Sequence, residues 1–246
     1  MWIYFQKNKY CFFILLFFHL LIVSSCKKET DTYVLNETGF VSDIDNNVYK
    51  TVKIGNQWWM AENLKVKTYR NGIPIPNAQS ENDWLSASAA YCIYDDNDYA
   101  PGLLYNWNSV IDSSNIAPAG WHIPTDQEWK ELEIHLGMTQ ADANKLNWRG
   151  TNEGEKLKIG GREGWSAFNN VWATNESGFT ALAGSCRLSN GTWGDPGLFA
   201  TGFWWSSSSF SDNSIWYRYL DYKESRIFRS KISKGYGFSI RCIKDY

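Results

Sequence analysis

The segment from Gly120 to Gly137 carries a complete set of helix start and stop signals. Thr125 followed by Glu128 is a capping box, in which the hydroxyl and the carboxylate each accept a hydrogen bond from a backbone amide that the helix leaves free. Gly137 supplies the left-handed residue that ends the helix. Between these signals, apolar residues recur at helical spacing: Trp129, Leu132 and Leu136. We expect sheet strands from the flanking sequence to pack on this stripe.

Residues 1–25 are predicted to be a targeting segment. Lys7 and Lys9 precede an apolar run over residues 11–23, which is short for a membrane-spanning helix of ~20 residues. The run ends in Val23-Ser24-Ser25 directly before Cys26, which resembles the lipobox of bacterial lipoproteins. The resemblance implies cleavage before Cys26 and lipid on its thiol and new amino group. The alternatives are a secretory signal cut near Ser25 and a retained membrane helix.

Residues 26–40 are predicted to form a flexible tether, because they are polar and have no apolar period, and residues 41–246 to form one domain. Multiple acyl chains would hold such a protein firmly at a membrane. No Asp directly follows Cys26, which favours the outer membrane, on either of its faces. The formal net charge of −2 gives no electrostatic attraction to nucleic acid.

Local patterns predict the other elements. Residues 48–60 read as a hairpin that turns at Gly55-Asn56, and residues 103–110 are ambiguous between helix and strand. Thr139 is expected to cap a second helix that runs to Leu146. After Gly150 turn residues alternate with short aromatic runs. Helices followed by strands indicate the α+β class.

Five blocks, in order along the chain, resemble the Fibrobacter succinogenes major paralogous domain. That family occurs in lipoproteins and secreted proteins of Bacteroidetes-like bacteria, and its activity is uncharacterised. More remotely, the helix start at 124–129 and the Gly-Phe-Ser-Ile-Arg-Cys end at 237–242 are similar to the formylglycine-generating enzyme family. Both resemblances imply a C-type-lectin-like fold, with two main helices packed on a twisted, mostly antiparallel sheet. The five blocks are residues 52–65, 102–107, 117–126, 204–208 and 237–245.

The cysteines leave their pairing open. With Cys11 in the signal and Cys26 at the lipid site, Cys92, Cys186 and Cys242 remain in an oxidising compartment, where three cannot all pair. The resemblance implies a Cys92–Cys242 disulfide, because the family blocks tend to carry cysteines at both places. A Cys186–Cys242 bond is the alternative.

The sequence supplies no complete catalytic or metal-binding set, so we expect no enzyme activity, no cofactor and no bound metal. Formylglycine-generating enzymes bind copper through two closely spaced cysteines, whereas Cys186 and Cys242 are far apart. His122 and His135 are the two histidines after the signal, and no Gly-x-Ser-x-Gly motif is present. The Asp-Asp-Asn-Asp run at 95–98 does not fit the spacing of a helix-loop-helix calcium site and is interpreted as a solvated turn.

Aromatic residues make up 17% of the chain, and this surplus predicts a binding surface. In residues 214–222, Trp216 falls on one face of the strand, and Tyr217 and Tyr219 on the other. By the same alternation, only one of Trp204 and Trp205 is expected to face the core. Core packing is the alternative for each residue. The predicted ligand-binding residues are Trp193, Trp204, Trp205, Trp216, Tyr217 and Tyr219.

These expectations combine into a lipid-anchored, non-catalytic binding module of the cell envelope, whose ligand is a glycan or a surface protein. The alternatives are a structural or fimbria-like surface component and an enzyme of unknown type. An enzyme would require a cleft with strongly shifted titratable groups.

Overall fold

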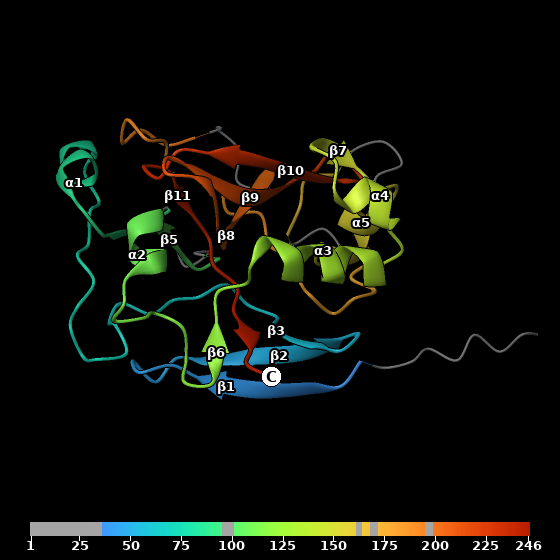
Figure 1. Cartoon of the computed structure of the whole chain (residues 1–246), viewed down its shortest axis with the longest axis horizontal. Helices are drawn as coiled ribbons and strands as arrows, with labels where there is room; N and C mark the ends of the chain where they lie inside the picture. The colour runs from blue at the N-terminus through green and yellow to red at the C-terminus, as the bar shows by residue number, and fades with distance from the viewer. Residues whose placement is uncertain (1–35, 95–100, 161–163, 168–171, 195–198) are drawn as a thin grey trace, which may run out of the picture. The chain divides into compact units, whose positions relative to one another are not determined.

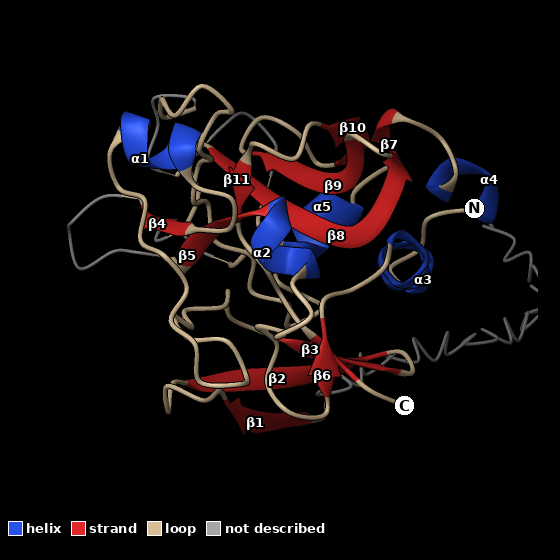
Figure 2. Cartoon of the chain, turned by 60° about the vertical axis from the view of Figure 1, so that its left-hand side comes forward, coloured by secondary structure: helices blue, strands red, loops and turns tan. Residues whose placement is uncertain are grey.

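Three antiparallel sheets and five short helices make up the described part of the chain. The computed structural model describes residues 36–94, 101–160, 164–167, 172–194 and 199–246, and Leu35–Tyr246 forms one compact unit. A five-stranded sheet lies at one end of this unit (Figures 1 and 2). Its strands, in spatial order, are β1 (Thr38–Ser42), β2 (Val48–Ile54), β3 (Gln57–Met60), β12 (Ile243–Lys244) and β6 (Trp121–His122).

The other two sheets lie at the opposite end of the unit (Figure 1). The four-stranded sheet has the order β7 (Asn147–Arg149), β10 (Ile227–Ile232), β9 (Ser214–Asp221) and β8 (Thr201–Ser211). The three-stranded sheet has the order β11 (Gly237–Phe238), β5 (Leu103–Asn106) and β4 (Tyr91–Ile93). The helices are α1 (Glu81–Ser86), α2 (Trp107–Ile111), α3 (Asp126–His135), α4 (Gln140–Ala143) and α5 (Glu153–Leu157).

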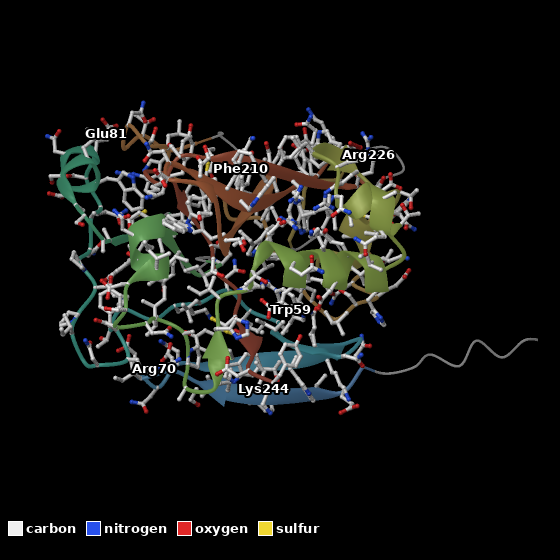
Figure 3. All side chains as sticks on the ribbon, in the orientation of Figure 1. Trp59, Arg70, Glu81, Phe210, Arg226 and Lys244 are labelled. Atoms are coloured by element: carbon white, nitrogen blue, oxygen red, sulfur yellow. The ribbon has the colours of Figure 1, made fainter. Side chains whose placement is uncertain are left out.

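Helix α3 lies between the five-stranded and four-stranded sheets (Figure 1). Its capping box is confirmed: Thr125 accepts from the Glu128 amide, and the Glu128 carboxylate accepts from the Thr125 amide. Trp129 is buried against Trp59 of β3, with ring centroids 4.9 Å apart, and Figure 3 shows Trp59 beneath the helix. The apolar stripe therefore joins two sheets into one interior, as an amphipathic helix between layers does.

The expected fold, α+β and C-type-lectin-like with two main helices on a sheet, is wrong. The structure is mostly β, with 34% strand and 15% helix. Gly137, at φ +117°, ends α3 after ten residues, and α4 is only four residues long instead of running to Leu146. A helical start signal says where a helix begins, but tertiary packing decides how far it continues.

The predicted hairpin at residues 48–60 is confirmed, with Gly55 at φ +60° in its turn. The ambiguous stretch 103–110 is both strand and helix: Asn106 ends β5, and its side chain caps α2 by accepting from the Ser109 amide. Strand β1 begins at Thr38, so the last residues assigned to the tether belong to the sheet.

The blocks that carry the family resemblance meet in the interior. Asn63 Oδ1 accepts from Trp204 Nε1 at 2.9 Å and from Arg241 Nε at 2.8 Å, while Asn63 Nδ2 donates to Ser239 Oγ at 3.2 Å. A Cβ atom on Gly102 would lie 2.6 Å from the Asn63 Cβ, so only glycine fits there. Residues from four of the five blocks thus meet at the buried Asn63 side chain. The residues that carry the resemblance therefore belong to the core.

Candidate functional site

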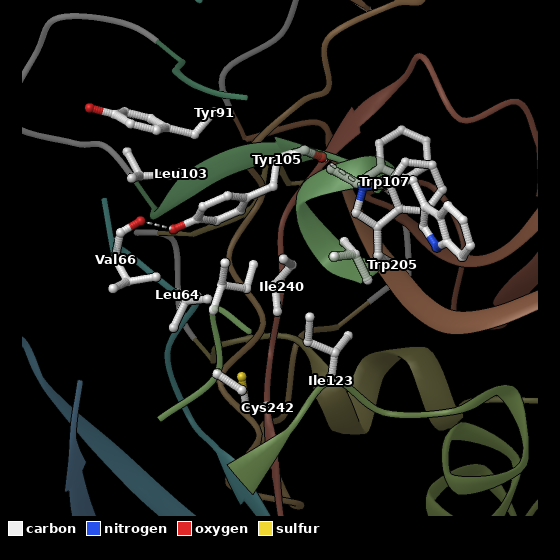
Figure 4. Packing of buried hydrophobic residues seen from close by; sticks show 14 of the residues in the cluster. Leu64, Val66, Tyr91, Leu103, Tyr105, Trp107, Ile123, Trp205, Ile240 and Cys242 are labelled. Carbon is white, nitrogen blue, oxygen red and sulfur yellow. Dashed lines mark hydrogen bonds between the residues drawn. The ribbon is translucent and has the colours of Figure 1, made fainter. Parts of the chain in front are cut away.

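Trp204 and Trp205 are both buried, so the expectation that one of them faces outward is wrong. Their exposed fractions are 1% and 0%. Strand β8 is covered on both faces: Trp204 packs in the cluster beneath α3, and Trp205 in the cluster that contains Tyr105 (Figure 4). Trp205 Nε1 donates to the Tyr105 carbonyl at 2.8 Å. Neither indole is available to a ligand in this structure.

The other four predicted binding residues do not share one surface. Trp193 is 38% exposed and stacks on Arg187, whose guanidinium carbon is 4.2 Å from the ring centroid. Trp216 is partly exposed on the α3 side of β9, where its ring covers the Arg229 guanidinium at 3.7 Å. Tyr217 and Tyr219 are on the opposite face, as the alternation predicted. Tyr217 is buried, and Tyr219 is partly exposed.

Tyr219 belongs to a row of aromatic side chains that crosses the four-stranded sheet. Phe228 is the cross-strand partner of both Trp148 and Tyr219, and Phe203 is the partner of Tyr219. Directly paired residues in antiparallel strands project from the same face. One partly exposed aromatic ring from each strand therefore stands on this face, next to the buried rings of Trp205 and Tyr217. We call Trp148, Phe228, Tyr219 and Phe203 the aromatic row.

The rings of the aromatic row touch one another in sequence. Centroid distances are 5.1 Å from Trp148 to Phe228, 5.7 Å from Phe228 to Tyr219 and 4.6 Å from Tyr219 to Phe203. The last two rings are nearly parallel, at 15°. Three interstrand spacings of ~4.8 Å make the row ~14 Å long. The row is thus a continuous apolar strip on the sheet face directed away from α3.

Polar groups lie beside the aromatic row. The Tyr219 hydroxyl donates to the carboxylate of Asp221, the next residue of β9 on that face. Ser230, two positions beyond Phe228, projects from the same face of β10 and is partly exposed. Apolar rings flanked by a hydroxyl and a carboxylate suit a ligand with alternating apolar and hydroxylated faces.

The α3 side of the same sheet holds a buried charge network with a structural role. Arg218 donates to Glu133 at 2.5 Å and to Asp126 at 2.9 Å, Arg229 donates to Asp126 at 2.6 Å, and Arg149 donates to Glu133 at 2.9 Å. Burial alone would raise the pKa of Asp126, but the hydrogen bonds and charges of Arg229 and Arg218 outweigh it and lower the pKa to about 2. These groups bind one another and hold α3 against β7, β9 and β10.

His122 and Lys158 are also engaged within the protein. His122 lies 2.8 Å from Glu128 and 2.7 Å from Asp245, and the hydrogen bond with Glu128 is the main cause of its raised pKa. Lys158 Nζ donates to the carbonyl oxygens of Asp221 and Glu224. Burial lowers the pKa of Lys158 to about 8. Each side chain therefore ties together segments that are distant in the sequence.

A hollow of about 260 Å³ lies near the β1–β2 turn, and its charged side chains form hydrogen bonds within the protein. Its Arg70 guanidinium donates to the carbonyl oxygens of Ala117 and Pro118 (Figure 3 labels Arg70). Its Asp43 carboxylate accepts from the Tyr49 hydroxyl at 2.5 Å. Both charged side chains that line the hollow are thus hydrogen-bonded within the protein.

The Cys92–Cys242 disulfide is not formed. Both thiols are free and buried. They do not pair because they lie in different clusters: Cys92 in a small cluster with Trp84 and Leu104, and Cys242 in the largest cluster. Cys186 packs in that same largest cluster. Burial raises the pKa of the Cys92 thiol to about 12, so it is protonated at neutral pH.

Some predictions fall on residues outside the described ranges: the signal peptide, Cys26, most of the tether, and the acidic run at 95–98. Within the described ranges, no group of three or more His, Cys, Asp or Glu side chains is placed to hold a metal ion. None of the helices described there has the length and apolarity of a membrane span.

Sequence reasoning missed three of the four residues in the aromatic row. Tyr219 was found because alternation within one strand is a local pattern. Trp148, Phe203 and Phe228 were not, because their alignment depends on the register between strands that are up to about 80 positions apart, from 148 to 228. The aromatic spacing of each strand is visible in the sequence, but its partner is not.

The fold and surface define a mostly β domain with a tryptophan-rich interior and one partly exposed aromatic face. A family model described as the Fibrobacter succinogenes major domain matches residues 52–244. The chain therefore belongs to that family, which confirms the main resemblance. The more remote similarity to formylglycine-generating enzymes is not shown. No curated protein and no solved structure matches the chain.

Proposed function

We propose that this protein is a lipid-anchored, non-catalytic binding module of the bacterial cell envelope, and that its aromatic row binds a glycan. The observation that carries the proposal is the row itself, with one partly exposed ring contributed by each of four adjacent strands. Phe203, Tyr219 and Phe228 also pack against the largest core cluster, so the partly exposed part of each ring is the surface that we propose for the ligand.

The chemistry of the row fits sugars. The C–H faces of pyranose rings are apolar and pack flat on aromatic rings, while their hydroxyls need hydrogen-bonding partners at the edge. The rings of Tyr219 and Phe203 stack on each other, so a sugar would meet the partly exposed edges of the row, and Asp221 and Ser230 stand beside it. A strip ~14 Å long accommodates more than one sugar ring in a line across the strands.

The lipid anchor is supported by the lipobox-like sequence that ends at Cys26. Eleven residues separate Cys26 from Thr38, the first residue of β1. At most ~3.5 Å per residue, this segment reaches up to ~40 Å. Such a tether leaves the domain free to orient its aromatic row toward a ligand outside the membrane, and it suits an outer-membrane lipoprotein.

Glycan binding is tested in two stages. A glycan array identifies the ligand, and calorimetric titration then compares the natural protein with Trp148→Ala. We expect the variant to bind at least about tenfold more weakly, which corresponds to ~1.4 kcal/mol of lost stacking and burial. Tyr219→Phe keeps its ring and is expected to lose less affinity, because it removes only the hydroxyl contact.

The matched control is Trp172→Ala, since Trp172 is 71% exposed and lies outside the row. Thermal unfolding shows whether each variant remains folded. An array without any bound glycan, or equal affinities for Trp148→Ala and Trp172→Ala, contradicts the proposal.

A further inference from the structure

Strand β1 is an open edge of the five-stranded sheet. In the described part of the chain it pairs with β2 on one side and with no strand on the other. Its central residue, Phe40, is 73% exposed. Val48 of β2, which is diagonal to Phe40 and on the same face, is 59% exposed. The edge thus combines unpaired backbone groups with a large exposed apolar side chain.

Proteins usually protect such an edge with charged side chains, proline or a bulge. The five residues of β1 are Thr-Gly-Phe-Val-Ser, with no charge and no proline, and they pair with β2 in unbroken register. Unpaired amide and carbonyl groups of an edge strand are satisfied best by another strand. These features identify the class of partner as a β-strand.

We propose that the partner strand is β1 of a second copy of this chain, paired antiparallel about a two-fold axis through Phe40. The sequence of β1 is self-complementary in that register. Phe40 lies opposite Phe40 of the partner subunit, and aromatic pairs of this kind stabilise sheets. Thr38 meets Ser42 of the partner subunit, hydroxyl to hydroxyl. On the other face, Gly39 leaves space for Val41 of the partner subunit.

The geometry also explains why the pairing is weak and where it occurs. Contact through one short strand buries less than the ~1,200 Å² of a stable interface, so dilute protein remains monomeric. Copies confined to a membrane by the proposed lipid anchor have a high effective concentration. The two copies of Thr38 would lie at opposite ends of the paired strands, ~14 Å apart, within reach of one membrane surface for both tethers. The aromatic rows lie on the other sheet and stay free.

The register is tested by disulfide cross-linking of full-chain variants that each carry one added cysteine, in their native membranes. Paired positions have Cα atoms about 4.5–5.5 Å apart, which a disulfide spans. Phe40→Cys is therefore expected to form about tenfold more cross-linked dimer than Leu85→Cys. Leu85 is the matched control because it is 60% exposed on α1, away from this edge. The native thiols Cys92 and Cys242 are fully buried.

Two further variants fix the direction of the strands. Thr38→Cys mixed with Ser42→Cys is expected to cross-link, whereas each of these variants alone is not. Dimer yield from Phe40→Cys no higher than from Leu85→Cys overturns the proposal, and so does strong cross-linking of Thr38→Cys alone, which indicates parallel pairing. Glycan titration of the same variants is independent of this outcome, because the aromatic row lies in a different sheet.

Discussion

The side-chain amide of Asn63 shows how one residue organises this interior. It is 1% exposed and connects three segments that are distant in the sequence, through Trp204, Ser239 and Arg241. Burial lowers the pKa of Arg241 to about 9. Its guanidinium donates to neutral oxygen atoms, those of the Asn63 side chain and of the Phe179 and Thr180 carbonyls. A buried donor without its acceptor is costly.

Asn63→Ala is accordingly expected to destabilise the protein by about 3 kcal/mol, because it leaves the Trp204 indole N–H and the Arg241 Nε–H each without an acceptor. Urea unfolding measures the change. The control is Asn71→Ala, an exposed turn residue whose side chain donates to Ser114, with an expected change of ~0.5 kcal/mol. A similar small loss for both variants shows that the interior reorganises around the missing amide.

Single residues could be predicted from sequence where their role is local. Thr125 and Glu128 satisfy each other three positions apart, so the capping box was predicted in full. The burial of both Trp204 and Trp205 was not predicted, because alternation indicates only that two neighbouring residues face opposite sides of the strand. It does not say that both sides are covered, and β8 is a strand whose two faces both meet a core cluster.

Among the elements, α3 depends on charge as well as on its apolar stripe. Asp126 and Glu133 lie on the same face of the helix, and both are buried against arginines of β9 and β10. The spacing of Asp126 and Glu133 is readable in the sequence, but their arginine partners on β9 and β10 are 85 to 103 positions away. This long-range pairing explains why sequence predicted the helix and its stripe but not which strands the helix contacts.

The network predicts how stability depends on pH. The Asp126 pKa falls from 3.8 to about 2 on folding, so its contribution is fully present above about pH 4 and is lost as pH falls toward 2. Urea midpoints measured along this range are expected to drop for the natural protein. Asp126→Asn is expected to be less stable at pH 7 and to have a shallower slope below pH 4, because it lacks this titrating group.

Asp212→Asn serves as the control for that experiment, since Asp212 lies in the exposed β8–β9 turn. Its pH profile is expected to match that of the natural protein. Identical slopes for the Asp126→Asn and Asp212→Asn variants contradict a stabilising role for the Asp126 carboxylate.

At the scale of the whole domain, the proposed functions occupy different layers. The aromatic row stands on the face of the four-stranded sheet directed away from α3. Strand β1 ends the five-stranded sheet, which lies on the other side of α3 (Figure 1). The chain from Cys26 leads into β1, so the tether joins the domain at the sheet that does not carry the row. Anchoring and ligand binding are therefore expected to be separable.

Cys26→Ala tests this separation. The variant is expected to lose its lipid and to leave the envelope fraction, while its glycan affinity stays within about twofold of the natural protein because the aromatic row is unchanged. Cell fractionation, intact-mass measurement of the N-terminus and titration with the array-selected glycan check the three statements. Lys27→Ala is the matched control, since it changes the neighbouring residue and keeps the cysteine. Retention of the Cys26→Ala variant in the envelope with an uncleaved N-terminus shows instead that residues 11–23 hold the protein as a membrane helix.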